Sequence, residues 1–333
     1  MPYLVRRAGL FVVTLWAALT VNFIIPRVMP GNEASAVLGT FRGVNPAALH
    51  ALEIQFGVHV HQSVLVSYFE YLKNILTGQF GVTAQGVPVM TEISSKLPWT
   101  LGLVGVTTII AFLIGTLAGV ASAWWRGGRL DAVLPPSLFI VSTIPVFFVG
   151  LLLIYVFAVK LAWLPLGSNY SIGATPELSL SFVGDVLEHA VLPGLSLIIV
   201  TAGLWVYSMR NNMITTIADD YVKMGRAKGL PTRRVMFDYA GRNAILPNLT
   251  GFAMQLGYVL GGAIVIEYLF SYPGLGYLFY TATTDHDLPL MQGLFLFYTG
   301  SPRLRADRRP HHSGSRSAHK GGLRWRRMQR RQS

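Results

Sequence analysis

The residues best suited to chemistry form a short charged island between two apolar stretches. Its sequence runs Asp219-Asp220-Tyr221-Val222-Lys223-Met224-Gly225-Arg226-Ala227-Lys228-Gly229-Leu230-Pro231 and continues to Ala244-Ile245-Leu246-Pro247. Seven basic side chains lie in or beside it: Arg210, Lys223, Arg226, Lys228, Arg233, Arg234 and Arg242. Ion pairs with the carboxylates of a partner would add specificity more than affinity. The chemistry predicted here is therefore docking onto another protein.

The common catalytic signatures are missing from the chain. It has no cysteine, which excludes disulfides, thiolate chemistry and cysteine-ligated metals. It also lacks the G-x-x-x-x-G-K-(S/T) phosphate loop and the H-E-x-x-H and G-x-S-x-G signatures. We therefore expect no catalytic residue, no metal site and no cofactor bound by this chain itself.

Composition points to a membrane. The chain is 52% hydrophobic and only 13% charged, against roughly a quarter charged for a soluble domain. Lipid offers no partner to backbone amides, so each spanning stretch must be helical. The predicted spans are Ala8–Ile25, Trp99–Trp125, Ala132–Val159, Ala190–Met209 and Leu249–Ile266. The first reads as a retained span, because no signal-peptide cleavage site follows it.

Prolines interrupt the third predicted span, at Pro135, Pro136 and Pro145. They suggest a kinked or broken helix whose freed carbonyls face protein or a water-filled path. The alternative is that prolines are simply commoner in membrane helices.

Basic residues in short loops predict the orientation. Arg6 and Arg7 precede the first span, and Arg126 and Arg129 separate the second from the third. Leu161–His189 and Ser271–Asp287, on the other side, contain neither Lys nor Arg. The N-terminus and the island are therefore expected in the cytosol.

The segment between the first two spans is expected outside. Within it, Ser63–Thr77 carries apolar residues at helical spacing and is followed by Gly78, so it predicts an amphipathic helix. Either it caps the external mouth or it is a docking surface for a substrate-binding protein.

The island itself predicts two short helices, Asn211–Lys228 and Thr232–Leu246. Gly229 can adopt the left-handed conformation that ends a helix, Thr232 suits the start of the second helix, and Pro247 is expected to close it. The same sequence pattern has two alternative interpretations. A DNA-reading helix–turn–helix would bring the bilayer into collision with the duplex, whereas a solvated basic loop without a specific partner stays open on composition alone.

Glu267, at the outer end of the fifth span, has two interpretations. It could be a gate or substrate contact, or it could anchor a helix end by packing against the Pro273-Gly274-Leu275-Gly276 turn. Carriers driven by ions need ionisable groups at mid-membrane depth, and the second and third spans have none. The sequence thus favours a passive gate that a partner powers.

The island resembles the coupling loop, or EAA loop, of ABC-importer permeases. It is similar to the pattern D-Y-V-(R/K)-x-x-R-A-K-G-L…R-N-A-(I/L)-L-P of the dipeptide/oligopeptide/nickel branch, with Lys223-Met224-Gly225 in place of Glu-Ala-Ala. Residues 261–276 resemble the family's GG-x-V-x-x-E-x-x-F-x-x-P-G-L-G, and residues 287–293 its D-x-P-x-(V/M)-Q-G. The long segment after the first span is similar to the B-type subunit of the permease pair.

This resemblance implies an all-α polytopic membrane protein with the ABC type I importer permease fold, normally of six spans. It implies import of di- or oligopeptides through the bacterial cytoplasmic membrane, with oligosaccharides or nickel complexes as alternatives. The implied partners are a second homologous permease, two ABC ATPase subunits that bind ATP and Mg, an extracytoplasmic solute-binding protein and membrane lipid, but no nucleic acid. A membrane assembly protein without a transport cycle is the alternative of a different class.

The resemblance also assigns residues. The ATPase-coupling set is Asp220, Tyr221, Lys223, Gly225, Arg226, Ala227, Lys228, Gly229 and Pro247. The translocation or gate set is Glu267, Pro273, Gly274 and Gly276. The expected regions are the first span at 1–29, the external segment at 30–97, the permease core at 98–298 with its coupling loop at 211–247, and a tail at 299–333.

The tail departs from the family pattern. The sixth apolar stretch, Leu288–Tyr298, stops after 11 residues, about 16 Å of helix and half of the hydrocarbon core. Residues 299–333 then carry 11 Lys and Arg against the single acid Asp307. Either this is a basic disordered tail that binds anionic lipid or nucleic acid, or a reading-frame shift near Tyr298 has replaced the span. The abrupt change favours the frameshift and an inactive product with five spans and a truncated sixth.

Overall fold

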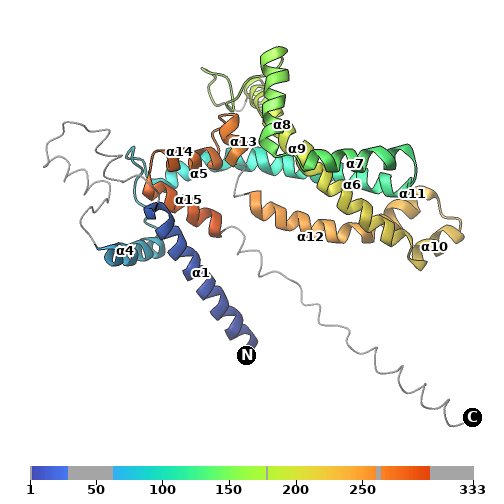
Figure 1. Cartoon of the computed structure of the whole chain (residues 1–333), viewed down its shortest axis with the longest axis horizontal. Coiled ribbons are helices and arrows are strands. Elements are labelled where there is room, and N and C mark those ends of the chain that lie inside the picture. The colour runs from blue at the N-terminus through green and yellow to red at the C-terminus, as the bar shows by residue number, and fades with distance from the viewer. Residues whose placement is uncertain (1, 29–62, 178, 260–263, 301–333) are drawn as a thin grey trace, which may run out of the picture.

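The computed structural model describes residues 2–28, 63–177, 179–259 and 264–300 (Figure 1). Over these ranges the chain is built from helices, with one isolated antiparallel bridge between Val82 and Pro88 and no strand. The all-α prediction is therefore confirmed. The predicted tail lies outside the described residues from position 301 onward, as do Gly261, Gly262 and positions 30–62 of the expected external segment.

The helices follow one another along the chain with short connections. Three of them, α5, α8 and α11, continue directly into wider, π-helical stretches, here labelled η. Their bounds are α1 Pro2–Val28, α4 Val64–Thr77, α5 Val89–Thr100, η1 Leu101–Gly105, α6 Val106–Trp124, α7 Arg129–Ser142, α8 Val146–Leu153, η2 Ile154–Lys160, α9 Leu180–Ile217, α10 Asp220–Ala227, α11 Thr232–Arg234, η3 Val235–Gly241, α12 Arg242–Tyr258, α13 Ile264–Leu269, α14 Leu275–Thr284 and α15 Leu288–Gly300.

Among the described residues, three helices are long and apolar enough to cross a membrane: Gly9–Val28, Val89–Trp124 and Leu180–Ile217. They confirm the first, second and fourth predicted spans. A fourth candidate is the pair Arg129–Ser142 and Val146–Lys160, which is bent by 100°. The predicted break in the third span is thus confirmed at Pro145, whereas Pro135 and Pro136 lie inside α7.

The last two predicted spans are less complete. α12 ends at Tyr258 and α13 begins at Ile264, and residues 260–263 between them lie outside the described ranges. Leu288–Tyr298 is a short apolar helix, as the sequence predicts.

α6 and α9 form the centre of the molecule, and α6 lies beside α9 along most of its own length (Figure 1). Glycines let their backbones approach closely. A Cβ atom built on Gly115 would lie 2.8 Å from the Ala202 carbonyl oxygen, and one on Gly119 would lie 2.7 Å from that of Val206. On the other side of α9, a Cβ atom on Gly203 would overlap the carbonyl oxygen of Leu138 in α7. Small residues thus bring three helices together, as is common in membrane bundles.

The two helices predicted in the island differ from the observed ones. The first is divided, because α9 continues to Ile217 and the chain turns before α10 begins at Asp220. The turn at Gly229 is confirmed, with φ at 72°. The second begins at Thr232 as predicted, but it runs through η3 and α12 to Tyr258.

Pro247 therefore lies inside α12 and does not close a helix, which corrects the sequence prediction. A proline is tolerated within a membrane helix when neighbouring helices support the freed carbonyl, and α12 packs along α9. The expected coupling loop at 211–247 accordingly includes the last turns of α9 and the first turns of α12.

Candidate functional site

The island forms a compact knob, residues 219–241, at one end of the molecule (Figure 1). We call this end, with α10 and α11, the basic end. A buried apolar cluster fixes the knob to the ends of three long helices. Its members are Val120 and Ala123 of α6, Met209 and Met213 of α9, Val222 of α10, Val235, Met236 and Ala240 of η3, and Ala244 of α12. Since Val222 is fully buried in this cluster, α10 cannot move without shifting the helix ends that it contacts.

The structure brings most of the predicted coupling residues onto one surface. The exposed ones are Asp220, Tyr221, Lys223, Arg226, Ala227, Lys228 and Gly229. Met224, which the sequence analysis did not assign, is 58% exposed beside them. The knob thus presents an apolar side chain surrounded by charges. Asp220 accepts a hydrogen bond from the Lys223 ammonium at 3.1 Å, an exposed pair of the kind that adds little stability.

Two predicted coupling residues are placed differently. Gly225 is buried, and a Cβ atom there would lie 3.4 Å from the ring of Tyr239. It therefore serves the packing of α10 on η3 and is not part of the exposed surface of the knob. Pro247 is exposed, but on α12, outside the knob.

Polar contacts connect the knob to the long helices. The Arg226 guanidinium lies over the ring of Trp124 at the end of α6, 4.7 Å from its centroid, a cation–π contact. The Asn243 amide of α12 donates to the Tyr221 hydroxyl at 2.8 Å. Arg226 and Tyr221 therefore each have a role within the chain as well as an exposed surface.

An ion pair that the sequence analysis missed lies beside the knob. The Asp131 carboxylate accepts from both Nε and Nη2 of Arg210, the latter at 3.0 Å, and from the Gly127 backbone at 3.0 Å. This bidentate geometry holds the turn between α6 and α7 against α9. Asp131 is a single acidic residue beside Arg126 and Arg129, which could have indicated an ion pair. The sequence did not indicate that its partner is Arg210.

A buried carboxylate, Glu267, lies in α13, well away from the knob (Figure 1). It accepts hydrogen bonds from the Thr100 hydroxyl at 2.8 Å, the Gly276 amide at 2.7 Å and the Tyr277 amide at 3.2 Å. The Thr100 hydroxyl in turn accepts from the Leu275 amide at 2.7 Å. The two amides belong to the first turn of α14, so the helix dipole and these hydrogen bonds offset part of the cost of burying the carboxylate. We call Thr100, Glu267 and the turn at residues 273–277 the latch.

The predicted gate residues thus lie together in the latch. A Cβ atom on Gly276 would lie 2.5 Å from the Ile264 Cα atom and 3.0 Å from Glu267 Oε2, and one on Gly274 would overlap the same carboxylate. Glycine at both positions is what lets the turn approach the carboxylate. Pro273 is half-buried next to them. The contact between Glu267 and the turn is the one that the helix-anchor interpretation requires.

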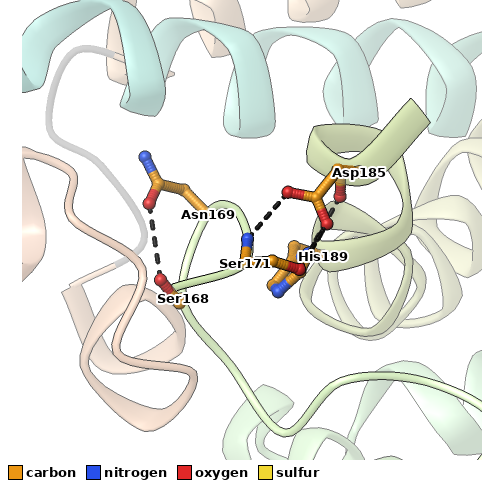
Figure 2. A network of polar contacts seen from close by, with 5 residues as sticks. All are labelled: Ser168, Asn169, Ser171, Asp185 and His189. Carbon is orange, nitrogen blue, oxygen red and sulfur yellow. Dashed lines mark hydrogen bonds and ion pairs between the residues drawn. The ribbon is translucent and has the colours of Figure 1, made fainter. Parts of the chain in front are cut away.

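A second polar network lies near the latch (Figure 2). The backbone amide and hydroxyl of Ser171 donate to the Asp185 carboxylate at 2.7 and 2.6 Å, and His189 Nδ1 lies 2.8 Å from the Asp185 carbonyl oxygen. In the same loop, Gly167 lies very close to Phe270. A Cβ atom on Gly167 would overlap the carbonyl oxygen of Phe270. The Ser168 amide donates to the same oxygen at 2.8 Å. The loop between η2 and α9 therefore packs over the end of α13.

Asp287, the first residue of the 287–293 motif, directly precedes α15. Its carboxylate accepts from the Ala84 amide at 2.7 Å and from the Leu290 amide in the first turn of α15 at 3.1 Å. It thereby ties the turn at residues 82–88 to the start of α15. Burial raises the pKa of Asp287 above its ordinary value, because desolvation disfavours the charged carboxylate.

In the parts of the chain that the structure describes, no three His, Asp or Glu side chains come close enough to hold a metal ion.

Comparison with known proteins gives a family match and similar relatives. Residues 91–300 match the family of the binding-protein-dependent transport system inner membrane component. The chain is 32% identical over 296 residues to the oligopeptide transport system permease protein AppB of Bacillus subtilis, covering 88% of this chain and 90% of that protein. It is 31% identical over 317 residues to the di/tripeptide transport system permease protein DppB of Pseudomonas aeruginosa, covering 90% and 93%. It is also 29% identical over 298 residues to the glutathione transport system permease protein GsiC of Escherichia coli strain K12, covering 89% and 91%.

Proposed function

Because the chain belongs to the family of binding-protein-dependent transport system inner membrane components, we propose that it is a permease subunit of an ATP-driven importer of short peptides. The three relatives are named for oligopeptide, di/tripeptide and glutathione transport. These names favour peptides over oligosaccharides or nickel complexes, and transport over a purely structural membrane role. The chain is a membrane protein and not itself an enzyme.

We further propose that the knob transmits the energy of ATP hydrolysis to the permease. Its exposed surface, Tyr221, Lys223, Met224, Arg226 and Lys228, would dock on a cytosolic ATPase subunit, which binds ATP and Mg. An apolar side chain inside a ring of charges suits such an interface. Movement of the docked knob would reach α6, α9 and α12 through the buried cluster around Val222.

The rest of the assembly follows from the same proposal. The basic end and the N-terminus would lie in the cytosol, in agreement with the distribution of Arg and Lys in the loops. The latch would lie on the extracytoplasmic side, where Glu267 and the 273–276 turn hold the outer part of the translocation path in place. A second homologous permease, two ATPases and an extracytoplasmic solute-binding protein would complete the importer.

Replacement of the four knob residues Arg226 to Gly229 by a neutral Gly-Ser-Gly-Ser segment tests this function. We expect the variant permease to lose co-purification with its ATPase subunits. Proteoliposomes containing it should lose ATP-dependent uptake of a radiolabelled tripeptide. The matched control is Ile172→Ser, at a fully exposed position in the loop near the latch, which should retain both. Unchanged co-purification and uptake in the knob variant would contradict the coupling role.

A further inference from the structure

Helix α4 has a wider apolar surface than its contacts in the chain require. Ser63 caps its first turn and Gly78, with φ at 72°, ends it, so it is a separate helix of 14 residues. Its polar side chains form one narrow stripe at helical spacing, Ser67, Glu70, Asn74 and Thr77. The remaining surface is mostly apolar or aromatic.

Part of that surface packs on α1. Tyr68 and Tyr71 lie against Phe23, with ring centroids 5.1 and 5.5 Å apart. The Tyr68 hydroxyl also forms a hydrogen bond of 2.7 Å with the hydroxyl of Thr20. These contacts fix the rotation of α4 about its own axis.

The fixed rotation leaves an apolar edge uncovered by the described chain. Leu65, Phe69 and Leu76 lie along one side of α4 and are 71%, 68% and 87% exposed. We call these three residues the α4 edge. Lys73 lies on the boundary between this edge and the polar stripe, a position from which a lysine can lay its alkyl chain on apolar surface and reach a polar layer with its ammonium.

The contact with Thr20 sets the depth of α4 relative to the first span. That span ends at Val28, so Thr20 lies about 12 Å inside its end at 1.5 Å per residue. α4 thus lies beside the apolar part of α1 and not beyond it, next to the end of α1 away from the N-terminus (Figure 1). At the same level, the neighbouring side chains Val21, Ile24 and Val28 of α1 are themselves exposed.

We propose that α4 is an interfacial helix that lies in the bilayer leaflet at the Val28 end of α1. The α4 edge contacts acyl chains and continues the lipid-facing surface of α1. The stripe of Ser67, Glu70 and Asn74 faces the headgroups and water, an arrangement typical of interfacial amphipathic helices. In the orientation proposed above this is the outer leaflet, and only that assignment rests on the proposed function.

Single-cysteine spin labelling tests the proposal directly, because the chain has no native cysteine. Leu65→Cys, Phe69→Cys and Leu76→Cys report on the α4 edge. Ser67→Cys, Glu70→Cys and Asn74→Cys are matched controls on the same helix. Each full-length variant is checked for native-like circular dichroism and reconstituted in phosphatidylethanolamine–phosphatidylglycerol liposomes. Collision of the nitroxide with oxygen, which concentrates in lipid, is compared with collision with a water-soluble nickel chelate.

Labels on the α4 edge should collide mainly with oxygen, and labels on the polar stripe mainly with the nickel chelate. Equal nickel accessibility of both sets would overturn the proposal, because the edge would then face water. Edge labels shielded from both reagents, or shielded only after a solute-binding protein is added, would also overturn it, because a protein would be the occupant. None of these outcomes depends on transport. The labelling experiment can therefore fail or succeed independently of the experiment on ATPase coupling.

Discussion

Individual residues far apart in the sequence hold the latch together. Thr100 and Glu267 are separated by 167 positions, yet the Thr100 hydroxyl both donates to the carboxylate and accepts from the Leu275 amide. Glu267 is fully buried, so each hydrogen bond that it accepts compensates part of its loss of hydration. The latch therefore depends on single polar atoms.

Replacing Thr100 with valine should lower the thermal midpoint of the detergent-solubilised protein clearly. The change keeps the shape but leaves Glu267 and the Leu275 amide each short of a partner, at about 1–3 kcal/mol for a buried unsatisfied group. The control is Thr250→Val in α12, where the exposed hydroxyl bonds only to the carbonyl of its own helix. Equal midpoints for the two variants would contradict the role of Thr100.

Asp287 predicts a pH dependence of stability. The folded protein binds the Asp287 proton more tightly than the unfolded chain does, because burial raises the pKa of this carboxyl. Its contribution is therefore most favourable below the ordinary carboxyl pKa of about 3.9 and decreases as the pH rises through the raised pKa. Asp287→Asn should flatten this part of the profile, measured as thermal midpoint against pH. A flat wild-type profile would refute the assignment.

At the scale of elements, the pairing of α6 with α9 depends on the absence of side chains. Gly115 and Gly119 are one turn apart and both face the backbone of α9. Close approach of this kind gives extensive van der Waals contact between two helices, which is a main source of helix association in lipid. The same glycines would cost stability in a helix without a close neighbour.

Alanine substitutions distinguish these two effects. Gly115→Ala should destabilise the protein by about 1–3 kcal/mol, because its Cβ atom would be forced against the backbone of α9. Gly184→Ala, in α9, has nothing within 4 Å of the new atom and should be neutral or stabilising by up to about 1 kcal/mol. Denaturation monitored by circular dichroism compares the two, and shifts of the same sign would contradict the close-packing argument.

At the scale of the whole molecule, one continuous helix, α5–η1–α6, joins the latch to the knob. Thr100 of the latch and Trp124, which contacts Arg226 of the knob, lie on the same α5–η1–α6 helix, about 36 Å apart along its axis. The π-helical stretch η1 follows Thr100 directly, and such stretches often mark functional sites or hinges. If the knob moves as proposed, this single helix would carry the displacement to the latch.

Trp124→Leu should therefore weaken the proposed coupling while the importer still assembles. Loss of the cation–π contact, about 0.5–2 kcal/mol, should lower peptide uptake per ATP hydrolysed at least about twofold in proteoliposomes. Trp125→Leu is the matched control, because the neighbouring ring is 58% exposed. The same ratio of uptake to hydrolysis in both variants would exclude Trp124 from the path.

The sequence alone determined the features that depend on near neighbours along the chain. The first, second and fourth apolar runs form long helices, because a helix satisfies its own backbone hydrogen bonds where lipid offers no partner. Gly78 and Gly229 end helices at the predicted positions, and the knob motif placed its charges on a short exposed helix.

Only the tertiary structure decided the features that depend on which helix faces meet. It showed that α12 continues through Pro247, that Gly225 serves packing, and that Asp131 pairs with Arg210. It also showed that Thr100 donates a hydrogen bond to Glu267, a contact that nothing in the sequence indicated. Local signals act through the hydrogen bonds of adjacent turns, whereas these contacts require helices from distant parts of the chain to pack at a particular rotation. That rotation is set by the combined fit of many side chains, and no single motif encodes it.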